Sequence, residues 1–142
     1  MPSADRVRAR TNPVINDRVD RDTVTRLRHH AGRGEDIERR LARLEGEWDI
    51  ERVLELNAAA IGVLGVALAV ARDRRWLVLP GAVLAFLALH AAEGWCPPVS
   101  VLRRLGVRTR AEIERERYAM KAMRGDFEGA TGRSQAAWRA VR

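Results

Sequence analysis

Two long apolar stretches occupy the middle of an otherwise charged sequence. Leu56–Ala71 carries no charged side chain, and Trp76–Ala92 carries none apart from a possible charge on His90. Only four polar residues separate them. Helices over Val53–Ala71 and Trp76–Trp95 would be about 28 and 30 Å long, close to the ~30 Å of a bilayer's hydrocarbon core. The pattern therefore predicts an all-α fold built on a transmembrane helical hairpin with two spans.

A shorter segment before the hairpin has the pattern of an amphipathic helix. Ile37, Leu41, Leu44 and Trp48 recur at spacings of four, three and four residues, so they share one helix face. The opposite face consists mainly of Glu and Arg. We expect this helix either to pack on a neighbouring helix or to lie in the head-group layer, where a terminal Trp is typical.

The distribution of charge indicates a lipid partner and an orientation. The net charge is +7, which suits phospholipid head groups or nucleic acid. The arginines alternate with acidic residues and lack an aromatic stacking platform, so we expect the lipid bilayer and no nucleic acid as the partner. Eight arginines flank the spans on the terminal sides, against three in the connecting turn. By the positive-inside rule, both termini are expected in the cytoplasm.

Cap and turn signals set the remaining boundaries. Asp49 is a candidate N-cap for the first apolar helix, and Gly106 is a candidate C-cap after a short helix. Thr109 and Glu112 match a capping box for a helix that runs to about Arg124. We therefore expect five segments: a polar, partly disordered N-terminal region (1–34), an amphipathic interfacial helix (35–48), the transmembrane hairpin (49–107), a cytoplasmic helix (108–127) and a basic tail (128–142).

Small residues recur along both apolar stretches at a spacing that lets helix backbones approach closely in lipid. They either pack the hairpin on itself or also form a face for a dimer, and the spacing does not choose between these. The candidate packing residues are Ala58, Gly62, Gly65 and Ala69 in the first stretch, and Gly81 and Ala85 in the second. Tryptophans near the ends of the apolar stretches are candidate interfacial anchors: Trp48, Trp76 and Trp95.

The residues around the second apolar stretch resemble a known family. The residues concerned are Glu51 and Arg52 with Asn57, then Gly94–Pro98 with its Cys-Pro turn, and Leu105–Val107. With these residues, the chain over about Trp48–Val107 is similar to the YgaP-like two-helix membrane domain of bacterial inner-membrane proteins, and this resemblance implies a location in a bacterial inner membrane. Some members of this family carry a fused rhodanese sulfurtransferase domain. This chain departs from them, because its sequence predicts no strands, and it resembles the stand-alone members instead.

Three side chains near the end of the second span could carry chemistry. His90, Glu93 and Cys96 lie at i, i+3 and i+6, and an imidazole, a carboxylate and a thiolate together suit a transition metal. Three ligands from one short stretch are a weak signal. The alternative is a His and a Glu at the interface beside a packed Cys. No phosphate-binding loop and no Ser-His-Asp arrangement is visible, so we expect neither a cofactor nor enzyme activity.

These observations leave three hypotheses about function. The favoured one is a non-enzymatic scaffold or accessory subunit, which associates with itself or with another membrane protein through helix–helix contacts. The second is a thiol-dependent sulfur or redox carrier, or a metal-binding membrane protein, centred on Cys96. The third is a peripheral basic protein that binds anionic membrane surfaces without spanning them.

Overall fold

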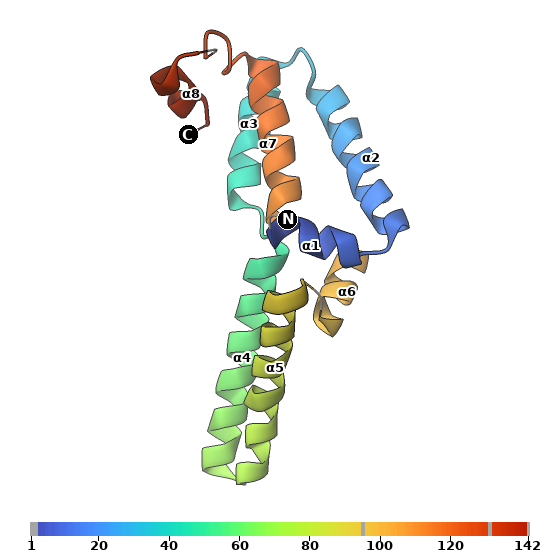
Figure 1. The fold of residues 1–142 in the computed structure, drawn as a ribbon, viewed down its shortest axis with the longest axis vertical. Coiled ribbons are helices and arrows are strands. Elements are labelled where there is room, and N and C mark those ends of the chain that lie inside the picture. The colour runs from blue at the N-terminus through green and yellow to red at the C-terminus, as the bar shows by residue number, and fades with distance from the viewer. Residues whose placement is uncertain (1–2, 95, 131, 142) are drawn as a thin grey trace. The chain divides into compact units, whose positions relative to one another are not determined.

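The computed structural model describes residues 3–94, 96–130 and 132–141, and the side chains from residue 6 on. The described residues form helices and turns without a strand, so the predicted all-α class is confirmed. The chain divides into two compact units: a first unit of residues up to 16 with 48–110, and a second unit of 17–47 with the residues from 111 on. In chain order the elements are α1 (Ser3–Arg10), α2 (Pro13–His30), α3 (Gly34–Gly46), α4 (Ile50–Ala71), the 3-10 helix η1 (Arg74–Leu77), α5 (Val78–Glu93), α6 (Pro97–Arg104), α7 (Arg110–Arg124) and α8 (Ser134–Val141) (Figure 1).

Two apolar helices dominate the first unit. α4 lies alongside α5, and η1 joins them (Figure 1); we call α4, η1 and α5 the helix pair. Asp49 caps α4 as predicted, since its carboxylate accepts a hydrogen bond from the backbone N–H of Arg52 at 2.8 Å. Asp73 caps η1 in the same way through the N–H of Arg75. Both α4 and η1–α5 belong to helical stretches long and apolar enough to cross a membrane.

A small apolar core holds one end of the helix pair to the other parts of the first unit. It consists of Val7 from α1, Ile50 and Leu54 from α4, and Cys96 and Val99 at the start of α6. Ile50 is fully buried. Because these residues come from segments as distant as Val7 and Val99, their cluster ties both ends of the unit's sequence to α4.

Glycines in the left-handed conformation end two helices of the first unit. Gly106, with a φ of +88°, follows α6: its N–H donates to the carbonyl of Arg103, and the next N–H, of Val107, donates to Leu102. These two bonds make the glycine C-cap that the sequence predicted. Gly94, with a φ of +73°, ends α5 by donating to the carbonyl of His90 at 2.7 Å.

The second unit is held by contacts between α3 and α7. Ile37 and Leu41 of α3 pack with Met120 of α7 in a buried cluster, and Leu27 of α2 adjoins it. The apolar stripe of α3 therefore packs on a neighbouring helix, one of the two arrangements expected. The predicted continuation of this stripe to Trp48 is wrong. α3 ends at Gly46 because Glu47 adopts an extended backbone, and Trp48 is 45% exposed.

A buried carboxylate links three helices of the second unit. Glu116 of α7 is fully buried. Its Oε1 accepts a hydrogen bond from Nε of Arg40 on α3 at 2.8 Å, and both of its oxygens lie 3.2 Å from Nε of Arg26 on α2. Two guanidinium groups thus compensate the desolvated charge, as a buried carboxylate requires.

Both polar ends of the chain contain helices, which differs from our expectation. The region 1–34 was expected to be partly disordered, yet its described residues include α1 and α2, where single apolar side chains such as Val7 and Val19 are buried. The segment 128–142 contains α8, and the Lys121 ammonium donates to the carbonyl of Ala140 at 3.2 Å. These helices lack a periodic apolar stripe, so the sequence pattern does not predict them. They are held instead by a few buried apolar residues and by polar contacts to distant segments.

Candidate functional site

The outer surface of the helix pair is apolar and open. None of the described residues of α5 is buried, and α4 has only three that are. Large side chains such as Val63, Val70 and Leu84 expose more than 60% of their area. Contiguous apolar surface of this kind marks a binding or membrane-contacting surface.

One of the predicted packing glycines lies between the two helices. A Cβ added to Gly65 would lie 2.6 Å from Cδ of Pro80, 3.0 Å from Cβ of Leu79 and 3.3 Å from the carbonyl oxygen of Trp76. Only a glycine lets α5 approach α4 this closely, so Gly65 packs the helix pair on itself.

The other predicted packing residues lie differently. A Cβ on Gly62 or Gly81 would meet no other atom within 4 Å, and Gly81 and Ala85 are exposed on α5. Ala58 lines a groove, described next, and Ala69 is half-buried. The sequence left open whether these residues pack the hairpin on itself or also form a dimer face. The structure places Gly65 between α4 and α5, whereas Gly62 and Gly81 lie open.

An apolar groove runs along the helix pair beside α6. Its volume is about 500 Å³, and its walls include Ala58 and Ile61 of α4, Phe86 of α5 and Val101 of α6. Asn57 is the one polar residue among the described residues that line it, and its amide donates to the carbonyl of Val53 at 2.8 Å. The groove therefore presents apolar side chains and has the character of an acyl-chain or helix-binding surface.

The predicted tryptophan anchors lie in different surroundings. Trp48 is half exposed, with the Arg52 guanidinium 4.6 Å from its ring centre, a cation–π arrangement. Trp76 is 41% exposed in η1, which precedes α5, whereas Gly94 caps the far end of α5. Trp95 lies outside the described residues.

The structure does not bring His90, Glu93 and Cys96 together as metal ligands. Among the residues it describes, no three His, Cys, Asp or Glu side chains are placed to hold a metal ion. Glu93 instead accepts a hydrogen bond from Arg10 at 3.2 Å. Cys96 is fully buried in the apolar core of the first unit, and this burial raises the pKa of its thiol. A buried thiol that resists ionisation is poorly suited to sulfur or redox exchange.

The charged end of the helix pair contains contacts that sequence analysis missed. The Arg6 guanidinium donates to the carbonyls of Ala91 and Ala92, at 3.1 and 3.2 Å, where α5 ends. A positive charge at the C-terminal end of a helix is stabilising, because the last carbonyl groups have no hydrogen-bond partner within the helix. The partners are 85 and 86 positions apart, and no local pattern in the sequence links them.

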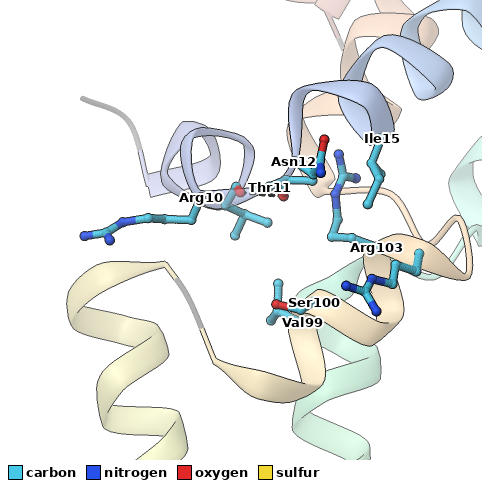
Figure 2. Close-up of a pocket in the computed structure, with 9 residues that line it drawn as sticks. Arg10, Thr11, Asn12, Ile15, Val99, Ser100 and Arg103 are labelled. Carbon is cyan, nitrogen blue, oxygen red and sulfur yellow. Dashed lines mark hydrogen bonds between the residues drawn. The ribbon is translucent and has the colours of Figure 1, made fainter.

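A cationic cavity lies between the α1–α2 connection and α6. Its volume is about 180 Å³, and Figure 2 shows Thr11, Asn12 and Ile15 on one side with Val99 and Ser100 on the other. The remaining lining residues are Val7 and three arginines, Arg10, Arg103 and Arg104.

Comparison of the chain with protein-family models, with curated proteins and with solved structures finds no match.

Proposed function

We propose that this chain is an integral membrane protein that crosses the bilayer twice and acts as a non-enzymatic scaffold or accessory subunit. The observation that supports this most directly is α5, an apolar helix of which no described residue is buried. A helix of this composition in the core of a soluble protein would be covered by its neighbours.

The dimensions of the helix pair fit a bilayer. α4 has 22 residues and is about 33 Å long at 1.5 Å per residue. η1 and α5 together have 4 and 16 residues, which gives about 32 Å for the second span. Both values match the ~30 Å of the hydrocarbon core. Helices suit this environment because a helix pairs most of its backbone polar groups within its own segment, as lipid requires.

The proposed location is a bacterial inner membrane with both termini in the cytoplasm. The excess of arginines on the terminal sides of the spans supports the orientation. The resemblance of residues 48–107 to the YgaP-like domain supports the type of membrane. The turn that holds Arg72, Arg74 and Arg75 would then face the opposite compartment.

Helix association is the proposed mode of action. Gly65 is used within the helix pair, so the open positions on α4 and α5, Gly62, Gly81 and Ala85, are the ones available to a second copy or to another membrane protein. Small residues on a lipid-facing surface let a further helix come close. A homo-oligomer and a complex with a larger membrane protein are both consistent with this surface.

Two experiments test the proposal. Extraction of membranes with alkaline carbonate should leave the protein in the pellet, whereas release into the supernatant would make it a peripheral protein. Affinity purification in mild detergent, followed by mass spectrometry, should recover either a defined oligomer or a stoichiometric membrane partner. In the oligomer assay, Gly81→Leu should weaken association while Leu84→Ile, a volume-conserving change on the same helix, should not. A monomer without partners would contradict the scaffold role.

A further inference from the structure

We propose that the cationic cavity binds the phosphate of an anionic phospholipid whose acyl chain lies in the apolar groove. The inference rests on the proposed membrane location and goes beyond it, because it assigns a ligand to one site. The cavity and the groove both belong to the first unit.

The cavity has the chemistry of an anion site. The side chains that line it include three arginines and no carboxylate. Guanidinium groups bind phosphate oxygens through charge-assisted hydrogen bonds. The volume of about 180 Å³ exceeds more than tenfold the roughly 10–15 Å³ that one water needs by the same measure. A phosphate with part of a headgroup therefore fits.

Two of the arginines are available at the surface. Arg104 is exposed and has no ion-pair partner among the residues that the structure describes. Arg10 forms an ion pair with Glu93 at 3.2 Å, but the two side chains are 58% and 50% exposed. Ion pairs this exposed to solvent contribute little to stability. In Figure 2 the Arg10 side chain extends away from Val99 and Ser100 toward the end of α5, so a change of rotamer would have to turn its guanidinium into the cavity.

The other side of the cavity adds a fixed positive potential. Asn12 precedes α2, and its side-chain oxygen accepts a hydrogen bond from the N–H of Val14 at 2.9 Å. The N-terminal end of α2, an 18-residue helix, thus forms part of the wall, and the helix dipole is positive there. Arg103 is 1% exposed, and its guanidinium donates to Asn16 at 2.8 Å and to the carbonyl of Val107 at 3.2 Å. Arg103 therefore holds the wall in place.

α6 separates this cavity from the apolar groove, and this favours a lipid over a soluble phosphate. Val99, Ser100, Arg103 and Arg104 face the cavity, whereas Pro98, Val101 and Leu102 line the groove. A single eight-residue helix therefore offers a cationic surface and an apolar surface to the two ends of one amphiphile. Basic pockets beside membrane-spanning helices bind anionic headgroups for the same reason.

Native mass spectrometry of the full-length protein in neutral detergent tests the assignment. The probes are phosphatidylglycerol and phosphatidylcholine with identical acyl chains. The wild type should bind phosphatidylglycerol about tenfold more tightly, and Arg10→Gln with Arg104→Gln should remove that preference. The matched control, Arg72→Gln with Arg74→Gln, makes the same change in charge at the opposite end of the helix pair and should retain it. Both pairs replace exposed side chains, so folding should persist.

Three outcomes would overturn the assignment. Equal binding of the two lipids by the wild type would remove the anion site. An equal loss in the control pair would make the effect one of overall charge. Displacement of phosphatidylglycerol by millimolar glycerol 3-phosphate would make the ligand a soluble phosphate. Carbonate extraction distinguishes failure of this inference from failure of the proposed function. If the protein stays in the membrane pellet but shows no preference between the two lipids, only this inference is wrong. If carbonate releases the protein, the proposed function is wrong.

Discussion

Gly65 of α4 lies against the ring of Pro80 of α5, so closely that a Cβ on the glycine would be 2.6 Å from Cδ of the proline. Pro80 is the third residue of α5, where the missing N–H of proline interrupts no helical hydrogen bond. A residue with no side chain and a residue with a rigid one thus meet near the start of α5, just after η1.

The first prediction concerns this contact. Gly65→Ala should destabilise the helix pair by about 1–3 kcal/mol, because the proline ring cannot move out of the way as a flexible side chain would. Gly62→Ala is the control: it lies one turn away and its Cβ meets nothing within 4 Å. Unfolding with SDS in mixed micelles measures both. Equal stability of the two variants would mean that the helices do not approach each other at Gly65.

The second prediction compares two glycines with positive φ. Gly94→Ala and Gly106→Ala share the cost of a left-handed alanine, about 1–2 kcal/mol. Only at Gly94 would the new Cβ also meet the neighbouring helix, 2.5 Å from Cβ of Arg6, whereas Gly106 is open. Gly94→Ala should therefore release α1 and speed tryptic cleavage after Arg10. Similar cleavage rates in the two variants would show that α1 does not pack at the end of α5.

The third prediction concerns the buried carboxylate of the second unit. Glu116→Gln leaves Arg26 and Arg40 without their shared countercharge, and breaking a buried pair costs about 3–5 kcal/mol. Glu38→Gln removes an exposed carboxylate from α3 and should change stability by less than about 0.5 kcal/mol. Hydrogen exchange of the α7 amides in the full chain reports both. Unchanged protection in Glu116→Gln would contradict the structural role of this side chain.

The fourth prediction concerns thiol reactivity. Since Cys96 is fully buried and burial raises the pKa of its thiol, iodoacetamide at neutral pH should alkylate it more than about tenfold more slowly than an exposed thiol. The control is Ser134→Cys in a Cys96→Ser background, because Ser134 is exposed. Rapid alkylation of native Cys96 would support the hypothesis of a sulfur or redox carrier.

The pKa of the Cys96 thiol is higher in the folded protein than in the unfolded chain. The folded protein should therefore lose stability as the pH rises above the ordinary pKa of a thiol.

Local signals predicted several element boundaries, and long-range contacts account for what was missed. The cap at Asp49, the glycine at Gly106 and the end of α7 at Arg124 each follow from a few neighbouring residues. The bonds from Arg6 to the end of α5 cross more than eighty positions. Arginines are common throughout this sequence, so nothing in their local pattern distinguishes the one that makes this contact.

The same reason explains why the cationic cavity was not foreseen. Asn12 reads in the sequence as a turn residue and Ser100 as an ordinary polar position, and only folding places them across a cavity. The predicted site residues were instead chosen because they are close in sequence. His90, Glu93 and Cys96 share one stretch of chain, yet packing gives each a different environment.

The most direct test of the two-span proposal is the labelling of single cysteines with a membrane-impermeant maleimide. In a Cys96→Ala background, Arg75→Cys marks the turn, where the arginine side chain is 92% exposed, and Ser134→Cys marks the C-terminal side. The proposal predicts that the turn is labelled in sealed right-side-out vesicles and Ser134→Cys only in inverted ones. Labelling of both cysteines from the same side would contradict two spans and leave a peripheral protein.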